Sequence, residues 1–204
     1  MKTTKQTRDL VLLAILTAIE LILAFTPLGY LRVGIIEITF MTVPIAVAAM
    51  MIGPHASLFL GCIFGITSFV QCFGISLFGT TLFGINPVFT FLLCFVPRAL
   101  MGFLVGVIFK AIHRVDKTGI LSFSVASLSA AALNTAFFVL GFFLMFRNAS
   151  LNLGGAVYDI SQMNILDVLV FIAGINGLIE IVVCTILSTV LGKVFVRLRA
   201  KYTA

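Results

Sequence analysis

The stretch PVFTFLLCFVPRALMGFLVGVIFKAI, residues 87–112, decides the fold of this chain. It is apolar over more than the roughly 20 residues that a helix needs to cross the hydrocarbon core of a bilayer. Pro97 predicts a kink in this helix, because proline lacks an N–H and its ring crowds the preceding turn. Arg98 follows directly, at a depth where a lone charge costs at least ~2.5 kcal/mol. The stretch therefore predicts a transmembrane helix with a functional charge inside it.

The rest of the chain has the same character. Of its 204 residues, 61% are hydrophobic and 10% are charged, and the mean hydropathy is +1.25. Soluble domains are about half apolar and about a quarter charged. No segment is long and polar enough to form a separate soluble domain. We therefore expect one transmembrane domain that covers residues 1–204.

Hydropathy predicts an all-α integral membrane protein with six transmembrane helices. The first apolar run is too long for a cleavable signal peptide and is predicted to be the first of these helices. Proline and glycine mark most of the breaks between the helices. The expected ranges are 9–27, 38–53, 55–73, 87–112, 119–146 and 164–192.

Three connections are expected on the side opposite the termini. They are residues 28–37, 74–86 and 147–163. The connection 74–86 is free of charge but rich in glycine and threonine, and is predicted to be too broken for a regular helix. The connection 147–163 is long and carries Gly154-Gly155, which is typical of a lid or binding loop.

The basic residues are concentrated on one side of this topology. Arg32 and Arg147 lie on the other side. Basic loops remain in the cytoplasm, so we expect both termini to be cytoplasmic. The net charge of +6 then favours contact with the anionic inner leaflet and not with nucleic acid. The ten residues on the basic side are Lys2, Lys5, Arg8, Lys110, Arg114, Lys117, Lys193, Arg197, Arg199 and Lys201.

Three charged side chains fall inside stretches long enough to span a bilayer: Glu20, Arg98 and Glu180. Such a residue is kept by a partner, by a water-filled cavity or by a ligand, so together they predict a binding site for a small charged molecule. Arg98 suits a carboxylate, because its forked donors match both carboxylate oxygens. The alternative is a structural ion pair with Glu20 or Glu180. Both interpretations can hold in different ligand states.

Polar residues on the last two predicted helices are candidates for the same site. Ser127, Asn134 and Gly141 follow one another at intervals of seven residues and share a helical face. Asn134 could bind a ligand amide or hydroxyl, or could tie helices together. Asn176 and Glu180 lie one turn apart, and could accept hydroxyl protons from a ligand. Alternatively, Glu180 pairs with Arg98.

Small residues recur at a spacing of four. Ala14 and Ala18 form an A-x-x-x-A motif, and two G-x-x-x-G motifs follow at Gly61…Gly65 and Gly102…Gly106. This spacing allows helix backbones to approach closely in lipid, and we expect the two glycine pairs to pack internally. The four cysteines show no C-x-x-C spacing. They are expected to be small buried thiols, with no disulfide and no metal site.

No motif for catalysis is found. The sequence contains no G-x-x-x-x-G-K-[ST] phosphate loop, no H-E-x-x-H and no G-x-S-x-G elbow. We therefore expect no enzymatic activity, no catalytic residues and no cofactor. Any use of ATP would require a separate ATPase subunit.

The order and spacing of several short motifs resemble the substrate-binding S components of energy-coupling factor (ECF) vitamin transporters. The resemblance covers essentially the whole chain, including the basic N-terminus that runs into Ala14 and Ala18. It is greatest for the pantothenate-specific members, through Pro97-Arg98 and Asn134-Thr135. The other residues that carry it are Pro27-Leu28-Gly29, Pro44, Gly53-Pro54, Leu60-Gly61, Phe64-Gly65, Ser68, Asn86-Pro87, Asn176 and Glu180.

The resemblance implies a six-helix vitamin-binding subunit in a prokaryotic plasma membrane. Such a subunit docks on one transmembrane coupling subunit and two ATPases, and Ala14 and Ala18 would lie on the docking face. Pantothenate is the expected vitamin, with Arg98, Asn134, Asn176, Glu180 and Ser127 as the expected binding residues. Another vitamin, such as riboflavin or folate, is the alternative, as is a stand-alone secondary transporter that uses Glu20 and Glu180 for protons. The role of Glu20 stays open.

Overall fold

The protein is predominantly helical, as the hydropathy predicts. The computed structural model describes residues 5–27, 29–33, 36–116, 120–153, 156–172 and 174–201. Two short antiparallel hairpins, β1–β2 and β3–β4, interrupt the helices within these ranges. The elements in order are α1 (Lys5–Phe25), β1 (Tyr30–Val33), β2 (Ile36–Thr39), α2 (Thr42–Met51), α3 (Pro54–Gln71), α4 (Leu77–Ile85), α5 (Pro87–His113), α6 (Ile120–Phe146), β3 (Ser150–Leu153), β4 (Ala156–Asp159), the 3-10 helix η1 (Ile160–Gln162), α7 (Ile165–Ile172) and α8 (Gly174–Lys201).

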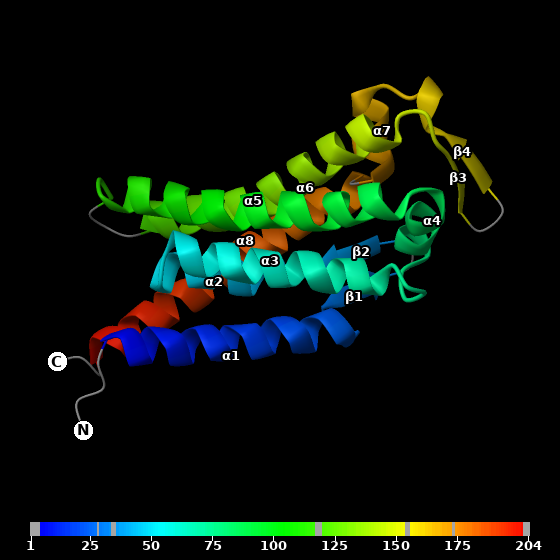
Figure 1. Cartoon of the computed structure of the whole chain (residues 1–204). Coiled ribbons are helices and arrows are strands. Elements are labelled where there is room, and N and C mark those ends of the chain that lie inside the picture. The colour runs from blue at the N-terminus through cyan, green and yellow to red at the C-terminus, as the bar shows by residue number, and fades with distance from the viewer. Residues whose placement is uncertain are drawn as a thin grey trace.

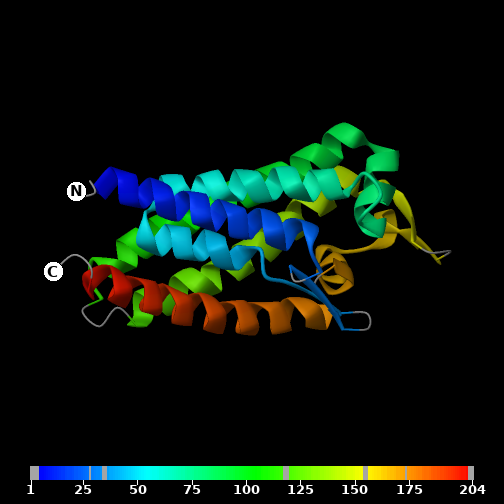
Figure 2. The same cartoon turned by 90° about the horizontal axis from the view of Figure 1, so that it is seen from below.

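The long helices run along an elongated bundle whose two ends differ (Figures 1 and 2). The start of α1, the turn between α2 and α3, the end of α5 and the end of α8 lie at one end. Both hairpins and α4 lie at the other, which we call the hairpin end (Figure 1). The segments with many basic residues therefore gather at the end opposite the hairpins.

Helix α2 is the centre of the bundle. Every residue from Thr42 to Met51 is buried, and the helix contacts α1, α3, α5, α6 and α8. Ten residues give a helix of only about 15 Å, about half of a bilayer core. The predicted second span over 38–53 is thus too long. Its first residues are β-branched and pair with β1 as strand β2.

Three helices are long and apolar enough to cross a membrane, within the part of the chain that the structure describes. They are Pro54–Gln71, Pro87–His113 and Leu121–Phe146. Two of them begin at a proline in the first turn, where the missing N–H removes no helical hydrogen bond. The side chain of Asn86 caps α5 by accepting hydrogen bonds from the backbone of Val88 and Phe89, each at 3.1 Å.

Two predictions from the sequence, one about a connection and one about a helix, are wrong. The stretch 74–86, predicted to be irregular, contains helix α4, which is capped by the Ser76 hydroxyl. The hydroxyls of Thr80 and Thr81 donate to backbone carbonyls one turn earlier, so these residues fit within a helix. The predicted helix over 164–192 is divided into α7 and α8. Gly174 begins α8 with a φ of +45°, a conformation that favours glycine.

The two G-x-x-x-G motifs form the contact between α3 and α5, which we call the glycine seam. A methyl group on Gly61 would overlap the carbonyl oxygen of Arg98, and one on Gly102 would overlap that of Ser57. A methyl group on Gly65 would approach the Cα of Phe95 to 2.8 Å. The glycines therefore set how closely the two helices pack. The predicted internal packing of both pairs is confirmed.

Candidate functional site

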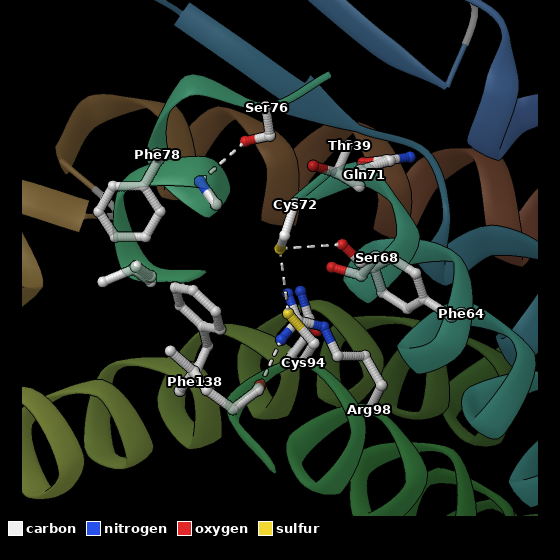
Figure 3. Close-up of a pocket in the computed structure, with 14 residues that line it drawn as sticks. Thr39, Phe64, Ser68, Gln71, Cys72, Ser76, Phe78, Cys94, Arg98 and Phe138 are labelled. Carbon is white, nitrogen blue, oxygen red and sulfur yellow. Dashed lines mark hydrogen bonds between the residues drawn. The ribbon is translucent and has the colours of Figure 1, made fainter. Parts of the chain in front are cut away.

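A cavity of about 140 Å³ lies between α3, α4, α5, α6 and the end of β2 (Figure 3). It is at the hairpin side of the glycine seam. Its walls combine polar side chains with large apolar ones, as is typical of sites for small molecules. The residues that line it are Thr39, Phe64, Ser68, Gln71, Cys72, Ser76, Phe78, Gly79, Leu82, Leu93, Cys94, Arg98, Asn134 and Phe138.

Arg98 is the charged residue of this cavity. Its side chain is only 8% exposed. The Nη1 atom donates a hydrogen bond of 2.7 Å to the backbone oxygen of Leu93. The guanidinium carbon lies 4.6 Å from the centre of the Phe138 ring and 5.3 Å from that of Phe64, within range of cation–π attraction (Figure 3). The guanidinium is therefore held from three sides inside the cavity.

Asn134 lines the same cavity from α6. Its Oδ1 atom is buried and has no hydrogen-bond partner among the described residues. A buried polar atom without a partner is costly and uncommon, so it calls for an explanation. A ligand that donates a hydrogen bond here supplies one. Arg98 was predicted from its charge and Asn134 from its helical face. The packing of α5 against α6 brings these two residues together at one site.

Ser127 does not line the cavity. Its hydroxyl donates to the Phe123 backbone oxygen at 2.8 Å and accepts from the Thr189 hydroxyl at 3.2 Å. The second bond links α6 to α8. The structure therefore places Ser127 at a helix contact, although it shares a helical face with Asn134.

Glu180 lies behind the cavity wall. It is buried on α8, outside the cavity lining, and its Oε1 has no hydrogen-bond partner within the described ranges. One turn further, the Cys184 thiol donates to the Thr39 backbone oxygen at 3.1 Å. Thr39 itself lines the cavity, so this face of α8 supports the wall at Thr39. The side chain of Asn176 is outside what the structure describes.

Comparison with known proteins identifies the family. Residues 8–192 match the family described as "ECF transporter, substrate-specific component". The chain belongs to this family. It is also 29% identical to the "Pantothenate transporter PanT" of Leuconostoc mesenteroides subsp. mesenteroides, over 199 residues that cover 94% of this chain and 93% of the relative. The resemblance in the sequence motifs is thereby confirmed at the level of the family.

Membership makes this chain a transport subunit and not an enzyme, as predicted. An ECF S component binds a substrate and associates with an energizing module in the membrane. The cavity with Arg98 and Asn134 is the candidate substrate site of this S component. Among the described residues, no group of His, Cys, Asp and Glu could hold a metal ion.

Several lining residues of this S component were not predicted from its sequence. The Sγ atoms of Cys72 and Cys94 lie 3.8 Å apart in the wall, although both cysteines were predicted only as buried thiols (Figure 3). Gln71 donates through Nε2 to the Ala24 backbone oxygen at 2.6 Å and links α3 to α1. A polar glutamine at the end of an apolar helix is a signal from which Gln71 could have been predicted as a lining residue. For Ser76 no comparable signal exists.

Helix α1 carries the remaining predicted residues of the S component. Glu20 is fully buried, and neither carboxylate oxygen has a hydrogen-bond partner in the described part of the chain. It lies outside the cavity, on the buried stripe that Leu16 and Ala24 complete. Ala14 and Ala18 are exposed on α1. These two residues are thus accessible to another protein or to lipid.

Proposed function

We propose that this S component captures pantothenate for ATP-driven import. The observation that carries the proposal is the juxtaposition of the Arg98 guanidinium and the Asn134 side chain in one buried cavity. A buried arginine matches the carboxylate of the vitamin through paired, charge-assisted hydrogen bonds. Asn134 matches a hydroxyl or amide group. The pantothenate transporter that the chain resembles over 94% of its length supports the same substrate.

The lining suits the rest of the pantothenate molecule. Pantothenate has two hydroxyls, an amide and a branched apolar centre in addition to its carboxylate. Ser68 and Ser76 bring hydroxyl groups, and Phe78 and Leu82 bring apolar surface. Asn176 and Glu180 belong to the proposed set on α8, where Cys184, one turn after Glu180, bonds to Thr39 in the wall. Ser127 links α6 to α8 through Thr189.

Size favours pantothenate over riboflavin and folate. A cavity of roughly 150 Å³ accommodates a single benzene ring. The cavity here, about 140 Å³, is thus much too small for fused rings without extensive opening. Pantothenate also exceeds a single benzene ring, but it is a flexible chain and requires less opening of the cavity than fused rings do.

We further propose six membrane crossings, with both termini in the cytoplasm of a prokaryotic cell. The start of α1, with Lys5 and Arg8, and the end of α5, with Lys110, lie at the end opposite the hairpins (Figure 1), which supports this orientation. The energizing module would comprise one transmembrane coupling subunit and two ATPases. Ala14 and Ala18 are the proposed docking residues, because both are small and exposed on α1.

Substrate identity is tested by calorimetry on the purified protein in detergent, combined with native mass spectrometry. We expect pantothenate to bind tightly and to survive purification as a bound mass. Riboflavin, folate and thiamine serve as competitors and should not displace it. Tight binding of one of them, with no binding of pantothenate, would overturn the proposal.

Docking is tested with Ala14→Trp and Ala18→Trp. Because these residues are exposed and lie outside the cavity, pantothenate affinity should stay within about twofold of the unmodified protein. Transport in vesicles that contain the complete importer should be lost, since a bulky side chain prevents close helix approach. Leu144→Trp, at an exposed position on α6, is the matched control and should transport normally. Loss of binding in the alanine variants would mean that the pair packs internally.

A further inference from the structure

We propose that Pro97 determines the preference of this site for a carboxylate, by fixing the guanidinium of Arg98. The inference rests on the proposed function, since it concerns the same cavity. It assigns a role to a residue that has no side-chain polar group and does not line the cavity. Pro97 is thus a positioning residue that acts through Arg98.

The first step concerns the backbone of α5. In an α-helix, the N–H of each residue donates to the carbonyl four residues earlier. Proline has no N–H, so Pro97 cannot donate to the carbonyl of Leu93. Leu93 is fully buried, which excludes bulk water as a substitute donor. A buried carbonyl with no donor is unfavourable, so this oxygen requires another partner.

The second step concerns the side chain that supplies this partner. Arg98 donates from Nη1 to the same Leu93 oxygen, at 2.7 Å. Long side chains on a helix point back over the preceding turn, toward the N-terminus of the helix. Arg98 can therefore reach the oxygen that its own neighbour leaves open. Pro97 thus leaves the Leu93 carbonyl oxygen without its helical donor, and the adjacent Arg98 supplies a donor in its place.

The third step is the effect on the cavity. The hydrogen bond to Leu93 fixes one nitrogen of the guanidinium, and the rings of Phe138 and Phe64 flank it at 4.6 and 5.3 Å. Each entering carboxylate then meets the guanidinium in the same orientation. Arginine has many rotamers, and a side chain that is already ordered loses less entropy on binding. Pro97 therefore strengthens binding of an acid, and does so much less for a neutral ligand.

The test is Pro97→Ala, measured by calorimetry with two ligands. One ligand is pantothenate, and the other is pantothenol, in which a CH₂OH group replaces the carboxylate. Alanine restores the N–H, which takes the Leu93 carbonyl and releases Arg98. We expect pantothenate to bind about 5- to 10-fold more weakly, the range that loss of side-chain preorganisation gives. Pantothenol affinity should change less than about twofold. Pro97→Ser restores the same N–H and should behave alike.

The matched control is Pro87→Ala, in the first turn of the same helix. No carbonyl depends on an N–H at that position, so both ligands should bind as in the unmodified protein. The double variant Pro97→Ala/Arg98→Ala should bind pantothenate as Arg98→Ala does alone, because Pro97 acts only through Arg98.

Each outcome distinguishes the inference from the proposed function. If Pro97→Ala weakens both ligands equally, or leaves pantothenate affinity unchanged, the inference is overturned and the proposed function stands. Pro97 is buried, so Pro97→Ala also removes packed ring atoms. If that variant fails to fold, Pro97→Ser, which restores the same N–H, is used for the same comparison of the two ligands. If instead Arg98→Ala keeps the preference for the acid over the alcohol, the proposed contact between Arg98 and the substrate carboxylate is wrong.

Discussion

The glycine seam and the cavity both lie between α3 and α5, but the two helices pack closely in the seam and separate at the cavity. In the seam, the backbone of α3 approaches that of α5 so closely that Gly61 and Gly102 have no room for a methyl group. A few residues away, the same helices separate around a cavity of about 140 Å³. The seam contributes packing that holds the helices together. The cavity keeps a polar atom of Asn134 without a protein partner, which a ligand can satisfy.

This difference indicates that separate residues of α5 determine the stability of the fold and the affinity for the substrate. The division lies near Arg98. Its carbonyl oxygen occupies the space that a methyl group on Gly61 would need, while its side chain lines the cavity. Changes in the seam should therefore lower the stability of the fold, and changes in the cavity should lower substrate affinity. The following predictions test this separation.

The largest expected effect is on affinity in Arg98→Ala. Removal of a buried charged partner weakens binding by roughly 100-fold or more, equivalent to about 2.7 kcal/mol. The protein should still be folded and extractable, because the seam is unchanged. Its melting temperature should be lower, because the buried Leu93 carbonyl loses its donor. Calorimetry with pantothenate measures the loss. Arg147→Ala is the control, since Arg147 also lies near a phenylalanine ring but is exposed outside the cavity. Retained affinity in Arg98→Ala would remove this residue from the site.

A smaller effect, on stability, is expected for Gly102→Ala. The added methyl group meets the Ser57 backbone oxygen, and a backbone cannot move aside as a side chain can. Overpacking of this kind costs roughly 1–3 kcal/mol, which appears as a lower melting temperature in detergent. Gly84→Ala, at a helical glycine with open space around it, should be neutral or slightly stabilising. Equal melting temperatures for both variants would contradict the close contact.

The smallest effect is expected for Asn134→Ala. Loss of one neutral hydrogen bond to the ligand costs about 1 kcal/mol, or roughly fivefold in affinity. Ser127→Ala, two turns earlier on the same face, removes the bond to Thr189 and should lower the melting temperature while affinity changes less than about twofold. If calorimetry shows that Ser127→Ala loses as much affinity as Asn134→Ala, then Ser127 also acts in binding.

Much of the helical layout was predictable because apolar length and proline position are local signals. The predicted helices 55–73, 87–112 and 119–146 agree closely with α3, α5 and α6. The shortness of α2 was not predictable, because a buried helix and a spanning helix have the same apolar composition. The helix α4 was missed because its glycine- and threonine-rich sequence disfavours helix. In the structure, the Ser76 hydroxyl caps it by accepting from the Gly79 N–H, and Thr80 and Thr81 satisfy their own hydroxyls within it.

The candidate site was predictable only in part. Arg98 could be predicted from the free-energy cost of a charge in an apolar span, because such a charge is kept only where it has a partner or a function. Asn134 could be found from its helical face. That face also contains Ser127, and nothing in the spacing separates the residue that lines the cavity from the one that contacts Thr189. Cys72, Ser76 and Thr39 line the site only because the end of α3, the start of α4 and the end of β2 meet at the cavity.

The sequence by itself determined that this is a helical membrane protein of the ECF S-component family with a buried charge beside a proline. These properties follow from hydropathy, charge and motif order, which require no knowledge of distant contacts. Only the tertiary structure decided that Arg98 donates to Leu93, lies between Phe64 and Phe138, and shares a cavity with Asn134. The physical reason is that a cavity is a property of the space between helices. That space depends on how closely the glycine seam lets α3 and α5 approach.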